Sequence, residues 1–460
     1  MRYISTRGRA EPVGFLDACL AGLAPDGGLY VPEHYPQIAP AQPDEPYVSI
    51  AARVLGAFAG DDLTANEVAG LCERAYGRFA HKEVAPLVQW GAGRWLMELH
   101  HGPTLAFKDV AMQVIGELYA LALERRDQTM SIVCATSGDT GGAAAAAFAG
   151  LERVSLTILH PHGRISPVQR LFMTTTGAAN VHNMALESDF DTCQSIVKSM
   201  FADKAFATSV RLSGVNSINW ARIAAQSVYY AAAQRQLGAD RPIHFVVPTG
   251  NMGDALAGYV AARCGMLSGL EITCAVNDNR ALVHVLETGR MARSETVPTP
   301  SPAMDITVPS NLERLLFDAS GRDHEAVSRL YDQFAQAGDV LLPDRIKGPL
   351  GCMGLGAVSI GAVETRSELV QLKAEMGALQ CPHTGVGTAA ARRLPQAGQS
   401  IVVLATAHAA KFPETVEAAT GRRPRLPDRC GALTPDREHY TQMPADLAAV
   451  KAAVSSAAPV

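Results

Sequence analysis

The stretch Ser131-Ile-Val-Cys-Ala-Thr-Ser-Gly-Asp-Thr-Gly-Gly-Ala-Ala-Ala-Ala-Ala-Phe148 decides the fold class of this chain. Residues 131–135 form a short, mostly apolar run that is typical of a buried strand. Residues 141–148 predict the start of a helix, and Val-Ser-Leu-Thr-Ile-Leu at 154–159 predicts the next strand. A strand, a helix and a second strand in this order form one βαβ step of a parallel sheet.

The same alternation continues on both sides of this stretch, from about residue 86 onward. Further strands are predicted at 180–186, 243–247, 271–276 and 401–405, and helices at 191–201, 218–237 and 253–264. Asp189 or Asp191 could cap the first of these helices. Short apolar runs that alternate with amphipathic runs indicate a sheet with helices on both faces, so we expect an α/β protein.

The first 85 or so residues follow a different pattern. Pro, Gly and Asp interrupt every apolar run around residues 24–32, before a helical stretch at 47–58. Four prolines predict an irregular connection at 298–309, and residues 348–361 carry no readable pattern. We therefore expect three domains, namely an N-terminal domain (1–85), a large domain (86–128 and 216–460) and a small domain (129–215).

The composition of the chain indicates which classes of partner the protein binds. The 460 residues include 48% hydrophobic and 18% charged residues and have a formal net charge of −5, without a long run of Lys and Arg. This composition favours small-molecule ligands over nucleic acid or a membrane surface, and no uncharged apolar run approaches the ~20 residues of a membrane span. Nine scattered cysteines without a C-x-x-C pair, and no secretory leader, predict free thiols in the cytoplasm. We expect a monomer or a weak homo-oligomer.

A metal centre is not predicted. The sequence contains no His-Glu-x-x-His, and the thirteen histidines show no ligand spacing with cysteines. His100 and His101 are adjacent, and we expect their side chains to point apart. Gly351-Cys-Met-Gly-Leu-Gly356 resembles a dinucleotide-binding loop only superficially, because no strand is predicted before it.

The segment His101-Gly-Pro-Thr-Leu-Ala-Phe-Lys-Asp109 is a Gly-Pro turn that leads into an apolar helix. Lys108 is thus predicted in the first helical turn, next to the positive end of the helix dipole. A partly desolvated lysine in such a field can attack a carbonyl as a free amine. A solvated surface lysine is the alternative, and this segment alone does not decide between the two.

Two loops of small residues each follow a predicted strand and open a helix. Ala135-Thr-Ser-Gly-Asp-Thr-Gly-Gly142 and Pro248-Thr-Gly-Asn-Met-Gly-Asp254 could direct backbone N–H groups at an anion. Each could also be a plain strand-to-helix turn with a capping residue. Neither is a Walker loop, because no Gly-Lys-Ser or Gly-Lys-Thr follows.

The segment Asn216-Ser-Ile-Asn-Trp-Ala-Arg222 places polar groups at the start of a helix, with an arginine one turn in. Arg, Asn and Ser side chains together can hold a phosphate through charge-assisted hydrogen bonds. Capping by Ser217 or Asn219, with Arg222 on the surface, is the alternative for this segment alone.

Taken in order, these segments resemble the threonine synthase family, which belongs to fold type II of the pyridoxal 5′-phosphate (PLP) enzymes. The resemblance covers nearly the whole chain. The matching segments are Tyr3–Gly8, Asp26–Pro32, His101–Asp109, Ala135–Gly142, His160–Gln169, Val215–Arg222, Val246–Asp254, Ser301–Ile306, Asn311–Phe317 and Thr406–Phe412. It implies two open, twisted, mostly parallel sheets flanked by helices, with an additional N-terminal domain.

The resemblance also implies roles for individual residues. Lys108 would bond covalently to PLP and act as the catalytic acid and base, and Thr406 would face the pyridine nitrogen. The remaining cofactor contacts would be Gly250, Asn251, Met252, Gly253, Asp254 and Asp139. The contacts to the substrate, O-phosphohomoserine, would be Thr136, Ser137, Thr140, Asn216, Ser217 and Arg222.

In the implied reaction, Lys108 removes the α-proton and then a β-proton, phosphate leaves the γ carbon, and water adds at the β carbon to give threonine. The chain departs from the family at Cys381, where an Asp is usual, at Pro309, where a serine is common, and over residues 340–375. Three alternatives stay open: a threonine synthase-like phospholyase, a serine or threonine dehydratase, and a non-catalytic protein that binds a phosphorylated ligand.

Overall fold

The larger of two extended sheets has six strands in the order β13-β10-β9-β14-β4-β3. This computed structural model describes residues 1–395 and 398–459. All neighbouring strands are parallel except β3 and β4, which form an antiparallel edge hairpin. The strands of this sheet are β3 (Leu87–Gly91), β4 (Arg94–Glu98), β9 (Ile243–Pro248), β10 (Glu271–Val276), β13 (Leu355–Ser359) and β14 (Ser400–Ala405).

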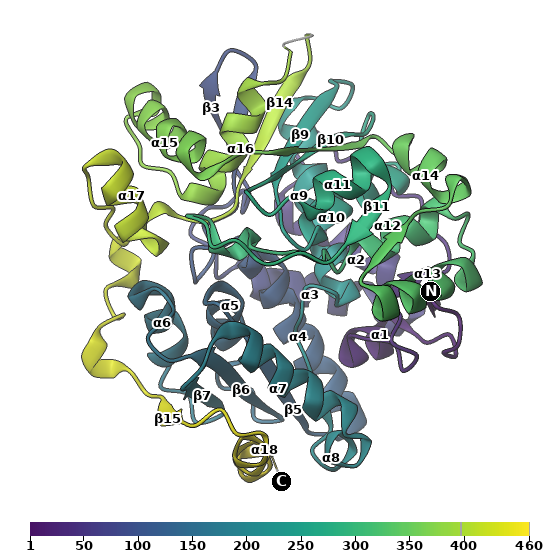
Figure 1. Ribbon diagram of the computed structural model, residues 1–460, viewed down its shortest axis with the longest axis vertical. Coiled ribbons are helices and arrows are strands. Elements are labelled where there is room, and N and C mark those ends of the chain that lie inside the picture. Colours follow the sequence, from purple (N-terminus) through teal and green to yellow (C-terminus); the bar gives the residue numbers. More distant parts are fainter. Residues whose placement is uncertain (396–397, 460) are drawn as a thin grey trace.

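The second sheet has five parallel strands in the order β15-β7-β6-β5-β8. It lies in the lower half of Figure 1, below the six-stranded sheet. The predicted βαβ step is confirmed, because β5 and β6 pair directly, with Met130 opposite Val154. The strands are β5 (Met130–Ala135), β6 (Val154–Pro161), β7 (Val181–Leu186), β8 (Leu212–Ser213) and β15 (Thr441–Met443).

Helices cover both sheets. α16 contacts β9, β10 and β14 of the large sheet, while α7 contacts β5 and β6 of the small one (Figure 1). The helices are α1 (Phe15–Ala21), α2 (Tyr47–Ala59), α3 (Ala65–Tyr76), α4 (Lys108–Arg126), α5 (Asp139–Phe148), α6 (Pro167–Thr174), α7 (Phe190–Ala202), α8 (Lys204–Ser209), α9 (Trp220–Leu237), α10 (Gly253–Arg263), α11 (Ala281–Thr288), α12 (Leu312–Ala319), α13 (His324–Ala337), α14 (Asp344–Gly351), α15 (Ala362–Met376), α16 (Pro382–Arg392), α17 (Pro413–Thr420) and α18 (Leu447–Ala457). The predicted α/β architecture is thus confirmed.

The N-terminal segment shares its core with the helices of the large sheet. Its strands β1 (Tyr3–Ser5) and β2 (Tyr30–Pro32) pair antiparallel, and α2 packs on α9. The fully buried ring of Trp220 on α9 lies 6.0 Å from the ring of Tyr3 and 5.7 Å from that of Phe58. This continuous aromatic packing fixes the N-terminal segment on α9.

The C-terminal segment returns to the small sheet. After α17 the chain runs along one side of the molecule, and β15 then pairs in parallel with β7 (Figure 1). α18 contacts α7 on the same sheet. Residues 441–457 therefore lie on the sheet that contains residues 129–215, although the sequence pattern placed them with the large domain. We retain the three predicted domains as a proposal, with this segment crossing between two of them.

Two local predictions are confirmed by the structure, and several elements were not predicted. Asp189 caps α7 by accepting a hydrogen bond from the Thr192 N–H at 2.8 Å, as expected. Lys108 begins α4, also as expected. The hairpin of β3 and β4 was not predicted, and residues 348–361 contain the end of α14 and strand β13. A further two-stranded ribbon joins β11 (Arg290–Ala292) to β12 (Asp339–Leu341).

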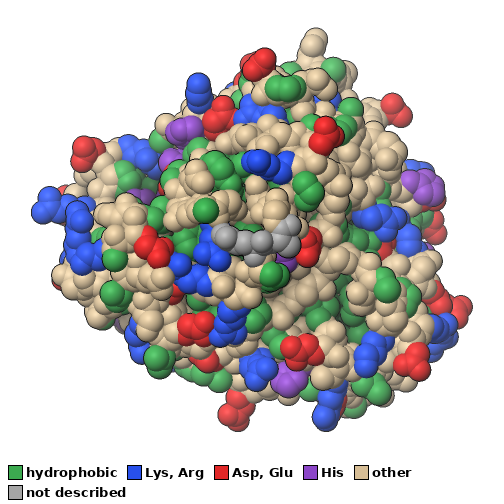
Figure 2. Space-filling model, turned by 90° about the horizontal axis from the view of Figure 1, so that it is seen from above, with side chains coloured by type: hydrophobic (Ala, Val, Ile, Leu, Met, Phe, Trp, Pro, Cys, Tyr) green, Lys and Arg blue, Asp and Glu red, His purple; other side chains and the backbone are tan. Residues whose placement is uncertain are grey.

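No helix among the described residues is long and apolar enough to cross a membrane. On the face shown in Figure 2, basic and acidic side chains are interspersed over the surface. All nine cysteines are unpaired, and only Cys352 among them is exposed.

Two glycines inside helices make a matched test of this packing. A Cβ at Gly116 on α4 would lie 2.6 Å from the carbonyl oxygen of Ala147 on α5, whereas a Cβ at Gly56 on α2 meets nothing within 4 Å. We expect Gly116→Ala to lower the free energy of unfolding by about 1–3 kcal/mol through overpacking. Gly56→Ala should leave it unchanged or raise it by up to about 1 kcal/mol through helix propensity. Urea unfolding of both variants checks this, and equal effects would contradict the close α4–α5 contact.

Candidate active site

The turn before α4 fixes the position of Lys108. The Asp109 carboxylate accepts hydrogen bonds from the Thr104 N–H at 2.8 Å and from the Thr104 hydroxyl at 2.6 Å. A Cβ at Gly102 would lie 2.4 Å from the Cβ of Asp109, so only glycine fits there. Leu105 adopts the left-handed conformation, with φ of 61°. The turn is therefore held by specific contacts at several of its residues.

The end of β14 lies against the same turn. The Phe107 N–H donates to the carbonyl oxygen of Thr406 at 2.7 Å, and the His408 N–H donates to that of Leu105 at 3.0 Å. Thr406 is buried. The large sheet thus brings Thr406 next to the start of the Lys108 helix, although the two residues are far apart in the sequence.

Asp139, the first residue of α5, lies between two buried lysines. Its carboxylate is 3.6 Å from Lys108 Nζ and 2.8 Å from Lys411 Nζ, and it accepts a hydrogen bond from Gln169 Nε2 at 2.9 Å. Lys411 is fully buried and also donates to the carbonyl oxygen of Thr104 at 2.7 Å. The sequence motif Thr406–Phe412 contained Lys411, but we assigned a role only to Thr406.

Electrostatics favour an uncharged Lys108 amine. Burial lowers the pKa of Lys108, and the nearby positive charges of Arg222 and Lys411 lower it further, against the opposing effect of Asp139 and Asp254. Burial alone would raise the pKa of Asp139, but Lys411 and Lys108 hold it well below its usual range. Asp139 therefore stays ionised while Lys108 releases a proton more readily than an exposed lysine.

The loop between β9 and α10 is tight and directs a helix N-terminus toward the site. Thr249 Oγ1 accepts from the Met252 N–H at 3.1 Å and donates to Asp254, and Met252 has a left-handed φ of 63°. A Cβ at Gly250 would lie 2.8 Å from Ile306 Cγ1 and 3.1 Å from the Met304 Cα. The proline-rich connection therefore passes directly over Gly250. A side chain does not fit at this glycine, because the Met304–Ile306 segment packs against it.

Arg222 is a buried cation without a counter-ion in the part of the chain that the structure describes. It is 3% exposed, its Nη1 donates to the Val215 carbonyl at 3.4 Å, and its Nε has no partner among those residues. Burial lowers its pKa to about 10, against a smaller opposing effect of Asp254. A buried, unpaired guanidinium is costly unless an anion binds to it. The alternative of a surface arginine is excluded.

Asn311 forms hydrogen bonds to both of the loops that are candidates for binding phosphate. Its amide Nδ2 donates to the carbonyl oxygens of Asn251 and Ser217, each at 3.1 Å. Arg314 in turn donates to Asn311 Oδ1 at 2.6 Å and to the Tyr30 carbonyl at 3.0 Å. Both residues lie in a segment that we had used only for its resemblance. Their contacts fix the two loops relative to one another and to β2.

The loop at the start of α5 supplies the remaining candidates. Thr136 Oγ1 accepts from the N–H groups of Gly138 at 2.9 Å and Gly141 at 3.0 Å, so its oxygen already holds the loop in shape. Ser137 and Thr140 are half-buried there. Asn216, by contrast, is exposed, whereas Ser217 is half-buried.

Three family models match this chain, and together they cover most of its length. Residues 2–76 match the family model "Threonine synthase N terminus", residues 84–337 match "Pyridoxal-phosphate dependent enzyme", and residues 384–454 match "Threonine synthase, C-terminal". Threonine synthase from Pseudomonas aeruginosa is 43% identical over 462 residues, covering 99% of this chain and 98% of that one. The chain belongs to the threonine synthase family. "Threonine synthase-like 2" from Homo sapiens is 34% identical, covering 96% of this chain and 94% of that one.

Solved structures of the family share the whole fold. The PLP-bound threonine synthase from Brucella melitensis superposes with a TM-score of 0.95 at 44% identity, covering 100% of both chains. Threonine synthase from yeast gives 0.92 at 33% identity, covering 99% of this chain and 98% of that one. The fold type II architecture implied by the resemblance is therefore confirmed.

The residues of the site fit PLP, the cofactor of this family. A buried lysine of lowered pKa can bond to its aldehyde, and the Gly250–Asp254 loop at the N-terminus of α10 can receive its phosphate. At Gly250 a Cβ would clash with the Met304–Ile306 segment, so the packing of this loop requires glycine there.

The departure at Cys381 is accommodated within the threonine synthase fold. Cys381 is the N-cap of α16, and its sulfur accepts from the Thr384 N–H at 3.4 Å. The thiol therefore takes the capping position of the usual Asp, and burial raises its pKa. The neighbouring His383 is another buried residue that we had not singled out; the Ala303 N–H donates to its Nε2 at 3.3 Å.

The prediction that His100 and His101 point apart is wrong. Their rings stack, with centroids 5.1 Å apart and planes at 26°. Both residues follow the end of β4 at Glu98, so the alternation of side chains along a strand no longer applies to them. His101 Nε2 lies 2.9 Å from Glu98 Oε2.

The variant Asp139→Asn tests whether the carboxylate between Lys108 and Lys411 stabilises the folded protein. The variant leaves two buried ammonium groups without an anion, so we expect it to lower the free energy of unfolding of the PLP-free protein by about 3–5 kcal/mol. Adding Lys411→Met should recover part of this loss, because it removes one of the two charges. Urea unfolding measures both effects.

A matched control is Asp203→Asn, which neutralises the carboxylate of the partly exposed surface pair with Lys451 and keeps a capping side chain at α8. We expect little change there, because ion pairs in contact with solvent contribute little. A loss in Asp139→Asn no larger than in Asp203→Asn would refute the energetic role of Asp139.

Proposed function

We propose that this chain is a threonine synthase that converts O-phospho-L-homoserine and water into L-threonine and phosphate. The observation that supports this substrate best is Arg222, a buried guanidinium without a carboxylate partner among the described residues and within electrostatic range of Lys108. An amino acid that reacts at a cofactor bound to Lys108 and carries a second anionic group would place that group against Arg222. A serine or threonine dehydratase has no use for the second anion site.

The proposed cofactor contacts are the residues named from the resemblance. Lys108 would bond covalently to PLP, and Gly250, Asn251, Met252, Gly253 and Asp254 would hold its phosphate. Thr406 would contact the pyridine nitrogen, and Asp139 lies 3.6 Å from Lys108 Nζ. When bound, PLP accepts the electron pair that remains after a proton leaves a substrate carbon.

Lys108 carries the protons of the reaction. Its amine gives up a proton more readily than that of an exposed lysine, because burial and two neighbouring cations lower its pKa. It takes the proton from the α carbon and later moves a second proton at the β carbon. Asp139 stays anionic throughout, since Lys411 holds it by a 2.8 Å ion pair. It orients the lysine and does not compete for the proton.

The substrate is held at both of its anionic ends. Thr136, Ser137 and Thr140 lie at the N-terminus of α5 and bind its carboxylate, which the helix dipole also favours. Arg222, with Ser217 and Asn216, holds the phosphate and stabilises the negative charge that develops as phosphate leaves. Thr136, Ser137 and Thr140 follow β5 of the small sheet, whereas Arg222 lies on α9, which packs on α10 of the large domain, so we propose that the site lies between the two domains.

Product analysis combined with Arg222→Met tests the proposal. Wild type should release threonine and phosphate in equal amounts from O-phosphohomoserine, and Lys108→Ala should release neither. Arg222→Met removes the charge that pairs with the substrate phosphate, so we expect KM to rise roughly 100-fold, consistent with the loss of about 3 kcal/mol for a charged hydrogen-bonded pair. Coupled assays for phosphate and for threonine measure this.

Arg241→Met is the control, because Arg241 is an exposed arginine just beyond the same helix. It should leave KM unchanged. Phosphate released with a keto acid instead of threonine would identify a phospholyase. An unchanged KM in Arg222→Met would remove Arg222 from the phosphate site.

A further inference from the structure

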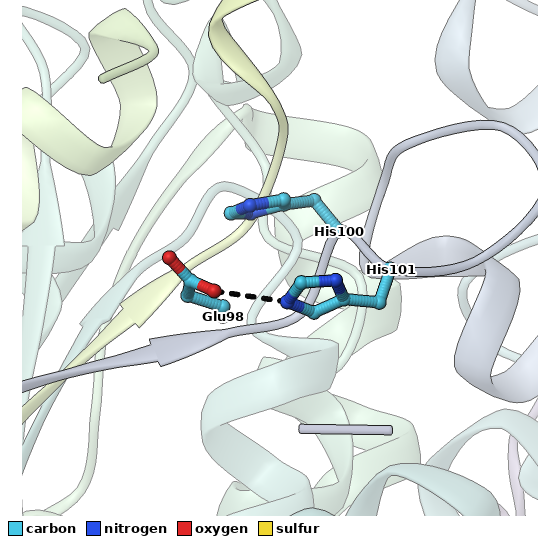
Figure 3. A group of neighbouring side chains, drawn as sticks. All are labelled: Glu98, His100 and His101. Carbon is cyan, nitrogen blue, oxygen red and sulfur yellow. Dashed lines mark hydrogen bonds and ion pairs between the residues drawn. The ribbon is translucent and has the colours of Figure 1, made fainter. Parts of the chain in front are cut away.

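Three potential metal ligands converge where β4 ends. Glu98 is the last residue of β4, and His100 and His101 follow it in the chain. One ligand atom from each of the three side chains lies within 4.8 Å of the other two. In Figure 3 both imidazole rings extend toward the side on which the Glu98 carboxylate lies. None of these side chains has a part in the proposed reaction.

The hydrogen-bonding of this cluster is incomplete. His101 Nε2 contacts Glu98 Oε2 at 2.9 Å, but the buried Nδ1 of His100 has no partner in the described part of the chain. A buried polar atom without a partner costs free energy. The lone pair of the unpartnered His100 Nδ1 could therefore bind a metal ion.

Two further histidines lie next to the cluster, but one ring nitrogen of each already accepts a hydrogen bond. The ring of His81 lies 5.2 Å from that of His101, and its Nδ1 accepts from the Glu83 N–H at 3.1 Å. The ring of His408 lies 5.5 Å from that of His100, and its Nδ1 accepts from the Ala410 N–H at 3.2 Å. The ligand set is therefore two imidazoles and one carboxylate.

We propose that Glu98, His100 and His101 bind one divalent cation of the zinc class. Two imidazoles with a carboxylate suit zinc and its neighbours, whereas magnesium and calcium prefer oxygen ligands. Zinc binds nitrogen and oxygen at about 2.0–2.2 Å, so tetrahedral ligand atoms lie about 3.3–3.6 Å apart, and the three side chains would have to move closer together around the ion. Side chains of Glu98 and His101 are 22% and 19% exposed, which gives the ion access and leaves room for water as a further ligand.

The site would be coupled to the turn before Lys108. His101 directly precedes Gly102, whose close contact with Asp109 fixes that turn. An ion held by His101 and by the end of β4 would join the turn to the large sheet. Because binding to the folded state alone stabilises it, zinc should raise the unfolding temperature of the holoenzyme.

The test is a zinc titration of the holoenzyme in a Cys352→Ser background, which removes the exposed thiol as a competing zinc ligand. A chromophoric chelator reports the free ion. We expect one equivalent to bind saturably, with affinity at least tenfold weaker in His100→Ala, His101→Ala and Glu98→Gln. His439→Ala, which removes an exposed histidine elsewhere, should bind as the parent does.

Absence of saturable binding in the parent protein would overturn the proposal, as would an equal loss in His439→Ala or full binding after loss of any one of the three ligands. The PLP absorbance band of each variant shows whether its site remains folded. Cobalt(II) provides a measurement that needs no variant. A visible spectrum of four-coordinate cobalt supports the site, and a spectrum of the hydrated ion refutes it.

Discussion

The Asp139 carboxylate, shared by Lys108 and Lys411, is the interaction on which the rest of the site depends. Lys108 begins α4, Asp139 begins α5 beside the small sheet, and Lys411 follows the end of β14 in the large sheet. Two buried ammonium groups would repel one another, and one buried anion offsets both. The same ion pairs therefore join elements of the two sheets and set the charge balance around the reactive amine.

The buried cations near Asp139 differ in whether they have a counter-ion. Lys411 is paired, whereas Arg222 is buried without an anion in the described chain, which makes it the cation available to a ligand. Asn311 and Arg314 hold the two loops beside it through hydrogen bonds to backbone oxygens. Because these contacts are made within the protein, they would hold the proposed anion sites in place, which limits the conformational entropy lost on binding.

Local chemistry explains which parts of the fold the sequence could predict. Residues 131–159 were predicted correctly because an apolar strand, a loop of small residues, an alanine-rich helix and a second strand are adjacent in the sequence. The place of β14 between β9 and β4 could not be predicted, since parallel pairing joins segments far apart in the sequence. Strand β15 is only three residues long, and nothing in its sequence indicates that it pairs with β7. For the site, the turn and helix around Lys108 were predicted from the sequence, but its role came only from the family resemblance, and Lys411 and Arg314 owe their positions to contacts that only the folded chain creates.

The central claim is that Lys108, and not the second lysine at the same carboxylate, holds the cofactor. Reduction of the holoenzyme with borohydride fixes PLP to the lysine that carries it, and peptide mass spectrometry then locates the modified residue. The account predicts a single modified peptide that contains Lys108, with Lys411 unmodified. Modification of Lys411, or of both lysines, would contradict it.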